Sequence, residues 1–337
     1  MSTVRIVNFA EIADPEWTFL EEKIKTKNVS WSFHSVSPRY RLERVVKRPN
    51  LARLRASMHV GFVARGAAAD LIVSHLPRAT LWTAIFAKLF HSKSKHLAFS
   101  FNFTELPKGL NKVLMRYAFK SIDRFVVFSE AERHLYASFF SLDINKFDAI
   151  RWCMDKPKTH ALNARLPEKY ICAVGGEGRD YESLVIAGQQ LRDLPIVIVA
   201  RPGSLAGLLP SANVTVFTNL KNEEFWHVVK SASFVVLPLK DGSTNCGHIS
   251  IVGSQTLGKP IVSTYSSGTS EYLQHGHNAL MSAAGDSHAL GENIKRLWED
   301  KTLYEELNAN VTADAPKHSI DNWVTYFDRY LLSTSRL

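Results

Sequence analysis

The sequence is poor in cysteine and has no long hydrophobic run. Cys153, Cys172 and Cys246 are spread over 337 residues, which is too few and too scattered for a disulfide framework or a zinc site and indicates a reducing compartment. The most apolar stretch, residues 81–90, contains Lys88, whereas a membrane-spanning helix needs about 20 apolar residues. Met1 leads directly into a strand-like segment, so no signal peptide is expected. We therefore expect a cytoplasmic protein that does not cross the membrane.

Acidic residues are scarce in the first half of the chain. Residues 1–165 hold 27 Lys and Arg against 14 Asp and Glu, a net charge of +13, whereas residues 166–337 hold 14 against 18, a net charge of −4. Such a basic half favours anionic partners, namely a phospholipid surface, a pyrophosphate-linked lipid or nucleic acid. No nucleic-acid-binding motif is present, so nucleic acid is not expected as a partner. We expect an anionic membrane surface, with the protein peripheral on the inner face of the cell membrane.

Cations gather between Arg39 and Arg55, where Glu43 is the single acid. This run is either a contact with an anionic membrane or acceptor, or a solvated, mobile connection, and both interpretations stay open. The segment 82–90 is also ambiguous. Its large apolar side chains share one helical face. That face is either directed to the core or dips into a membrane. Its members are Trp82, Ile85, Phe86, Leu89 and Phe90.

Short β-branched segments alternate with helix-length segments throughout the chain, a pattern typical of parallel sheets with crossover helices. The expected strands are 4–7, 31–34, 71–74, 96–101 and 125–128 in the first half, and 170–174, 196–199, 214–217, 234–239 and 261–264 in the second. The alternation restarts after a polar, proline-bounded stretch at residues 156–167, which we interpret as a linker. The sequence thus predicts an α/β protein with two Rossmann-like, doubly wound domains at 1–155 and 168–315. An amphipathic C-terminal segment, 316–337, is expected to return to the first domain.

Two loops of the second half have the character of phosphate sites. Gly175, Gly176 and Gly178 follow the first strand and precede Arg179 at a helix start, so the backbone can fold closely around a phosphate and the guanidinium can bind it. The second loop, 242–247, consists mainly of small residues and joins the strand 234–239 to a helix from about His248. Unpaired N–H groups and the helix dipole favour an anion there. A tight βα turn explains the first loop equally well.

The segment 241–272 resembles the donor site of GT-B glycosyltransferases, most closely of family 4. Members of that family typically carry E-x-F-G-x5-E-A-M-A-x-G-x-P-V-V-x-T followed by G-G-x-x-E. The frame survives at Gly247, Gly258, Pro260, Ile261, Val262, Thr264, Gly268 and Glu271. Asn245 and Gly253 stand at the positions of the two family glutamates. In the family the second of these commonly holds the ribose of the donor, so Ser250 is expected to take over that contact here.

The resemblance implies GT-B architecture, with the domains facing each other across a cleft, and a nucleotide-sugar donor linked to UDP or GDP. Arg179 aligns with the family's diphosphate-binding lysine, and the turn 218–220 aligns with the turn that binds the base through its main chain. The expected donor-binding residues are Gly175, Gly176, Gly178, Arg179, Arg201, Thr218, Asn219, Leu220, Ser243, Thr244, Asn245, Cys246, Gly247, His248, Ser250 and Glu271. No cofactor is implied, and metal-independent transfer is expected.

The acceptor is expected on the basic first domain. Asn102 stands about where family members often have a histidine, and with Glu105 and Asn245 it is assigned to catalysis. The residues expected to bind the acceptor are Glu11, Asp14, His75 and Asn102. The sequence therefore predicts a hexosyltransferase that acts on a glycan or lipid-linked acceptor in bacterial cell-surface polysaccharide or glycolipid synthesis. The alternative is a non-catalytic GT-B homologue that serves as a nucleotide-binding or partner subunit.

Overall fold

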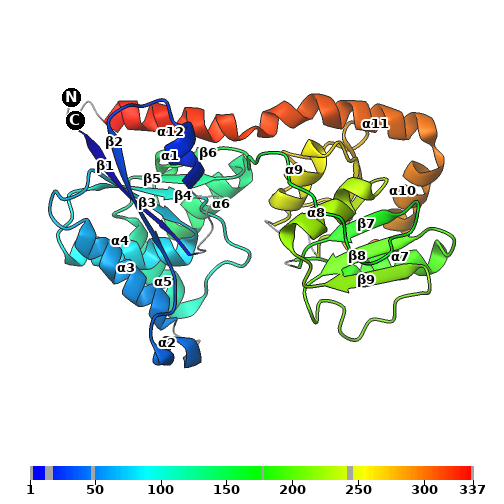
Figure 1. Cartoon of the computed structure of the whole chain (residues 1–337), viewed down its shortest axis with the longest axis horizontal. Coiled ribbons are helices and arrows are strands. Elements are labelled where there is room, and N and C mark those ends of the chain that lie inside the picture. The colour runs from blue at the N-terminus through cyan, green and yellow to red at the C-terminus, as the bar shows by residue number, and fades with distance from the viewer. Residues whose placement is uncertain (1–2, 12–17, 47–49, 177, 241–245, 335–337) are drawn as a thin grey trace. The chain divides into compact units, whose positions relative to one another are not determined.

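The computed structural model describes residues 3–11, 18–46, 50–176, 178–240 and 246–334 (Figure 1). By its internal contacts the chain forms two compact units. The first comprises Met1–Arg151 together with Trp323–Leu337, and the second comprises Trp152–Asn322. The second unit is therefore one continuous stretch of chain, whereas the first is completed by the C-terminal helix.

The first unit is built on a parallel sheet with the strand order β2-β1-β3-β4-β5-β6. Buried β-branched and aromatic residues fill its inner strands, as expected for a sheet covered on both faces. The strands are β1 (Val4–Ala10), β2 (Val29–Ser35), β3 (Leu71–His75), β4 (Lys95–Phe99), β5 (Arg124–Val127) and β6 (Phe147–Ala149).

Helices cover both faces of this sheet. In Figure 1, α3, α4 and α5 lie on one side and α1 and α12 lie on the other. Right-handed crossovers place α1 opposite α3, α4 and α5, because the chain moves from β1 to β2 in one direction along the sheet and from β2 to β3 and onward in the other. The helices are α1 (Phe19–Lys23), α2 (Arg41–Val45), α3 (Leu51–Val63), α4 (Pro77–Leu89), α5 (Gly109–Phe119), α6 (Glu130–Phe140), the 3-10 turn Ile144–Lys146 and α12 (Ile320–Thr334).

The C-terminal helix α12 is fastened to the first unit by aromatic and polar contacts. The rings of Trp323 and Phe327 lie 5.3 and 6.3 Å from the ring of Phe99 at the end of β4. Tyr326 donates a hydrogen bond to Asp148 in β6 (2.7 Å). Asp328 accepts from the backbone N–H of Thr26 (3.0 Å). The last helix in the sequence is thus part of the core of the first unit.

The second unit repeats the architecture with the strand order β12-β11-β10-β7-β8-β9, again all parallel. Its strands are β7 (Ile171–Val174), β8 (Ile196–Ala200), β9 (Val214–Thr218), β10 (Val235–Leu237), β11 (Ile261–Thr264) and β12 (Ala279–Ser282). Its helices are α7 (Tyr181–Gln190), α8 (Asn222–Ser231), α9 (His248–Thr256), α10 (Ser287–Glu299), α11 (Lys301–Asp314) and the 3-10 turn Ala315–His318.

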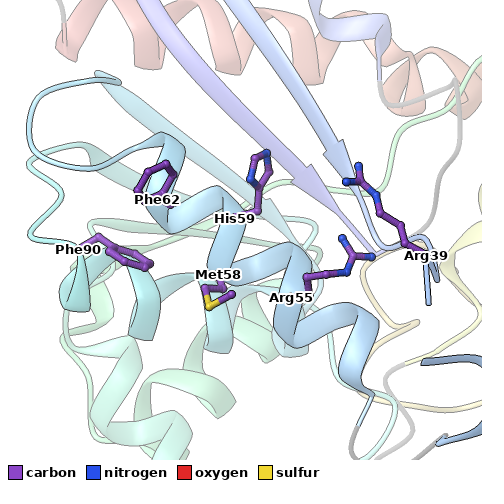
Figure 2. A pocket seen from close by; sticks show the side chains of 6 residues that line it. All are labelled: Arg39, Arg55, Met58, His59, Phe62 and Phe90. Atoms are coloured by element: carbon purple, nitrogen blue, oxygen red, sulfur yellow. The ribbon is translucent and has the colours of Figure 1, made fainter. Parts of the chain in front are cut away.

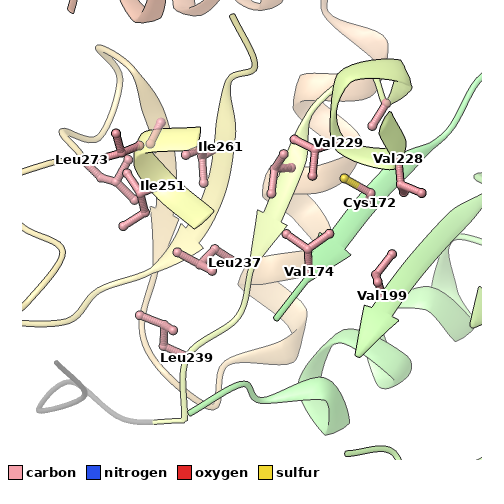
Figure 3. Close-up of a cluster of buried hydrophobic side chains, with 14 of the residues drawn as sticks. Cys172, Val174, Val199, Val228, Val229, Leu237, Leu239, Ile251, Ile261 and Leu273 are labelled. Atoms are coloured by element: carbon pink, nitrogen blue, oxygen red, sulfur yellow. The ribbon is translucent and has the colours of Figure 1, made fainter. Parts of the chain in front are cut away.

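Alternation along the strands divides the core of this unit into two layers. Cys172 and Val174 point into the layer closed by α8 and α9, which Figure 3 shows. Ile171 and Ala173, their neighbours in β7, point into the layer closed by α7, α10 and α11. Both faces of β7 are therefore buried, so the loop that follows it starts from a closely packed strand.

All ten strands expected from the sequence are present, with small shifts of their ends. The sheets also contain β6 and β12, which were not among the expected strands. Each has only three or four residues and lies at the edge of its sheet. The expectation of two doubly wound parallel sheets is confirmed.

Candidate donor site

The turn after β7 brings a buried arginine against two glycines. Gly175 has φ +113°, and a β-carbon at this position would lie 2.6 Å from Nη2 of Arg179. At Gly176 a β-carbon would lie 2.6 Å from Cγ of Arg201, the residue after β8. Because such approaches are too close for any side chain, these two glycines make room for the two arginines.

Arg179 bridges the glycine turn and the start of α9. Its Nε donates to the carbonyl of Val174 (3.0 Å), its Nη2 donates to Oγ of Ser250 (3.0 Å), and its Nη1 lies 3.7 Å from the Cys246 sulfur. Only 7 % of Arg179 is exposed. A guanidinium that contacts a carbonyl, a hydroxyl and a thiol favours an anion beside it.

The helix α9 begins beside this arginine. Its N-cap is Gly247, with φ +103°, and a β-carbon there would lie 3.8 Å from Nη1 of Arg179. Residue 248 follows as a buried histidine whose Nε2 lies 2.9 Å from the carbonyl oxygen of Gly268. Burial lowers the pKa of His248 to about 4, so the ring is neutral at neutral pH. The positive end of the helix dipole thus adds to the charge of Arg179 at one place.

On the same helix, Gly253 faces a side chain of the core. A β-carbon at this position would lie 2.0 Å from Cη2 of Trp226, a buried residue of α8. The indole therefore occupies the space that any side chain at position 253 would need. Ser250, the expected substitute for a carboxylate here, accepts a hydrogen bond from Arg179, and its contact with a ribose stays a prediction.

The expected donor residues form one cluster and several outlying positions. Arg179 joins Gly175, Cys246 and Ser250 in direct contact, and Arg201 joins through Gly176. Gly178 lies in the same turn after β7 and directly precedes Arg179. The remaining described positions follow other strands: Thr218 and Asn219 are exposed at the end of β9, Leu220 packs on the core, and Glu271 is half-buried after the 266–270 turn. Ser243, Thr244 and Asn245 lie outside the described residues.

The first unit holds a buried carboxylate, Glu132, that was not among the expected site residues. Glu132 is fully buried in α6, and it accepts hydrogen bonds from Asn102 Nδ2, from the N–H of Phe128 (2.7 Å) and from the hydroxyl of Tyr136 (3.2 Å). Ser129 caps the helix, because its Oγ accepts from the N–H of Glu132 (3.1 Å). The contact between Glu132 and Asn102 joins residues 30 positions apart, so no local sequence pattern indicates it.

The other expected acceptor residues are placed separately. His75 is buried at the end of β3, its Nε2 lies 2.8 Å from Oδ1 of Asn8, and burial lowers its pKa to about 3. Glu11 forms an ion pair with Arg53 (2.9 Å), and Glu105 is exposed in the loop after β4. Asp14 lies outside the described residues. Thus two of the expected residues that the structure describes are held by buried polar partners, Asn102 by Glu132 in the loop after β4 and His75 by Asn8 at the end of β3.

The described part of the chain contains no group of three or more His, Cys, Asp or Glu that is arranged to hold a metal ion. Metal-independent transfer stays a prediction.

The comparisons with known proteins match this architecture. Residues 173–300 fit the family model described as "Glycosyl transferases group 1". The second unit therefore carries a glycosyltransferase domain. This domain includes the Arg179 cluster and all of α9. No curated protein matches the sequence significantly.

Solved structures similar to the whole chain have the same two-sheet fold. Anabaena HepE in complex with UDP-glucose superposes with a TM-score of 0.71 at 13% identity, covering 99% of this chain and 100% of HepE. Sucrose-phosphate synthase from Thermosynechococcus elongatus gives 0.72 at 12%, covering 98% of both chains. The lipopolysaccharide outer core galactosyltransferase WaaB gives 0.66 at 11%, covering 98% of this chain and 99% of that one. The chain thus has the GT-B fold, and the glycosyltransferase domain is its second unit.

Proposed function

We propose that the protein transfers a sugar from a UDP- or GDP-linked donor to a glycan or lipid-linked acceptor, as a divergent relative of glycosyltransferase family 4. The observation that carries the proposal is the buried Arg179 guanidinium, which connects the glycine turn after β7 to the start of α9. The family match covers this cluster. HepE, similar in fold, is a protein whose structures contain UDP and UDP-glucose.

Transfer of the sugar requires stabilisation of the nucleoside diphosphate as the leaving group. When the bond between the anomeric carbon and the diphosphate oxygen breaks, negative charge develops on the diphosphate. A fixed guanidinium and the N–H groups at the start of α9 stabilise this charge without reorganisation. Arg201, beside Gly176, supplies a second cation from the neighbouring strand. No step in this scheme requires a metal ion.

Activation of the acceptor is assigned to the first unit. Asn102, fixed by Glu132, is the residue we propose to position the acceptor hydroxyl, and Glu105 in the same loop is proposed as the proton acceptor. Because the first half of the chain is so basic, we further propose that the acceptor is a lipid-linked or acidic glycan at the surface of a bacterial membrane. WaaB, similar in fold, is named as a lipopolysaccharide outer core galactosyltransferase.

A donor panel tests the proposal. Purified protein is incubated with UDP- and GDP-sugars, and free UDP or GDP is measured with and without glycolipid extract. Release of one nucleotide, increased by acceptor and abolished in Arg179→Ala, is the expected result. The proposal fails if no donor is turned over and if neither UDP nor GDP binds in calorimetric titration.

A second candidate, a nucleotide-binding subunit without catalysis, is favoured by one observation. Trp226 fills the space at Gly253, where the resemblance places the carboxylate that holds the ribose. Binding of UDP or GDP without turnover of any donor in the same panel would support this second function.

A further inference from the structure

Three consecutive helices of the first unit contain no acidic residue. They are α3, α4 and α5, which lie side by side on one face of the sheet (Figure 1). Over residues 44–122 the sequence has 14 Lys and Arg against two acids, Asp70 and Glu105. Six of these cations lie on the three helices, namely Arg53, Arg55, Arg78, Lys88, Lys112 and Arg116, so this layer of helices is basic.

The outer surface of α5 carries an apolar stripe that the fold does not use. Leu110, Val113 and Tyr117 are spaced by three and four residues and share one helical face. They are 82 %, 64 % and 58 % exposed. The buried face of the same helix is formed by Met115, Ala118 and Phe119. Since α5 already packs on the core through these residues, the exposed stripe is available to a partner.

Contacts between neighbouring helices extend the stripe. Lys88 of α4 donates to the hydroxyl of Tyr117 (2.8 Å) and lies 4.5 Å from the centre of its ring. Phe62 of α3 packs edge-on against Phe90, which follows α4, at 5.8 Å. We name this surface the α3–α5 face. It comprises Met58, Phe62, Leu89, Leu110, Val113 and Tyr117 with the cations Arg65, Lys88, Lys112 and Arg116.

A pocket of about 330 Å³ lies beside α3 at the edge of this face (Figure 2). Met58, Phe62 and Phe90 form its apolar part, and Arg39 and Arg55 stand at the opposite end from Phe90. Arg55 is paired with Glu43 (2.6 Å). The backbone N–H of Arg39 donates to the carboxylate of Glu43 (2.7 Å). In the part of the chain that the structure describes, no carboxylate forms an ion pair with the charged side-chain group of Arg39, Arg65, Lys88, Lys112 or Arg116.

We propose that the α3–α5 face docks on an anionic phospholipid bilayer, with the apolar side chains in the acyl boundary and the cations among the phosphates. Apolar side chains flanked by unpaired cations fit such an interface. A second copy of the chain fits it poorly, because symmetric pairing of this face would set cations against cations. The inference rests on the proposed function for its membrane-bound acceptor and adds the surface that reaches the membrane.

The test is co-sedimentation of the full-length protein with vesicles, without any sugar donor. Vesicles of phosphatidylcholine with phosphatidylglycerol are compared with phosphatidylcholine alone. The variant Leu110→Glu/Val113→Glu places two charges in the stripe. The matched control Ile186→Glu/Leu209→Glu places two charges at exposed apolar positions of the second unit. Thermal unfolding verifies that both variants are folded.

We expect the wild-type protein and the control variant to bind anionic vesicles. The stripe variant should lose at least about tenfold in partition, because each Leu or Val withdrawn from an apolar phase forfeits more than a factor of ten. Binding that is unchanged in the stripe variant, or equally weakened in the control, overturns the proposal. So does equal binding to neutral vesicles, or a concentration-dependent dimer that the stripe variant abolishes.

The outcome is separable from that of the proposed function. Donor turnover is measured in solution, where the stripe variant should match the wild type because its two positions lie outside the Arg179 cluster. Turnover without vesicle binding contradicts only the α3–α5 face. Vesicle binding without nucleotide binding contradicts only the glycosyltransferase assignment.

Discussion

At the scale of single residues, the proposed function makes Arg179 the group on which donor binding should depend most. We expect Arg179→Ala to weaken binding of UDP or GDP by about 1.5–3 kcal/mol, the range for a hydrogen bond to a charged group. Binding of uridine or guanosine should change much less, because the guanidinium faces the start of α9, where we propose that the diphosphate binds. The resemblance places the base elsewhere, at the turn 218–220. Calorimetric titration with each nucleotide and its nucleoside measures the difference.

Arg192→Ala is the matched control, since Arg192 is an exposed arginine at the end of α7. It should leave both affinities unchanged. Equal losses for nucleotide and nucleoside in Arg179→Ala would mean that the variant has disturbed the turn as a whole, and the diphosphate role would be abandoned. The loss of the hydrogen bond to Val174 predicts some loss of stability in any case, so binding is compared at a temperature where both variants are folded.

A second residue-scale prediction concerns Gly253 and Trp226. Gly253→Ala should lower the free energy of unfolding by about 1–3 kcal/mol, the usual cost of overpacking a core, because the new methyl group would lie 2.0 Å from the indole. Urea unfolding of the purified variant measures it.

Gly291→Ala in α10 is the control for this substitution. A β-carbon there would lie at an ordinary contact distance of 3.6 Å from Ala187, so the variant should gain about 0.5–1 kcal/mol from its better helix propensity. If Gly253→Ala proved as stable as the wild type, the indole would be free to move aside, and a carboxylate at position 253 would again be sterically possible.

At the scale of elements, the strands could mostly be predicted from the sequence, but which face of a helix is buried could not. A buried parallel strand such as β8 or β11 is recognised by a short run of β-branched residues between turns. The strands β6 (Phe-Asp-Ala) and β12 (Ala-Leu-Met-Ser) lack that signal, because neither contains a β-branched residue.

The helix α4 illustrates what periodicity leaves open. Its large apolar residues share a face, but the side chains fully buried in it are mostly small: Pro77, Ala79, Thr80, Leu81, Thr83 and Ala84. Trp82 and Ile85 are half-buried, and Leu89 is exposed. The small residues are explained by close packing against α3, where a β-carbon at Gly61 would lie 2.8 Å from Phe86. This close packing depends on a glycine of the neighbouring helix, so the pattern of α4 alone could not predict it.

The candidate site shows the same division. The glycines and Arg179 were identified because a strand, a glycine turn and a helix start have a recognisable order along the chain. The pairing of Arg179 with Ser250 joins residues 71 positions apart, and the contact of Trp226 with Gly253 joins two different helices. Neither contact has a local pattern, so the filled space at position 253 could not be predicted.

At the scale of the whole molecule, the two units differ in how the chain completes them. The second unit is continuous from Trp152 to Asn322 and contains the whole Arg179 cluster. We expect the isolated fragment 152–322 to fold with a single cooperative urea transition and to bind UDP or GDP as tightly as the full chain does through this cluster. Circular dichroism and calorimetric titration of the fragment measure both properties.

The first unit is completed only by the C-terminal helix, and its fragment should behave differently. Without residues 323–337, Phe99 loses its ring contacts with Trp323 and Phe327, Trp31 loses its stacking on Phe327, and Asp148 loses its bond to Tyr326. Large aromatic side chains dominate the energetics of a core of this size, so the fragment 1–151 should aggregate or lack near-ultraviolet dichroism. Joining residues 320–337 to it through a flexible linker should restore a cooperative transition. If the fragment 1–151 folded as well alone as when joined to this helix, α12 would contribute little to the stability of the first unit, and its aromatic contacts would have to serve a purpose other than folding.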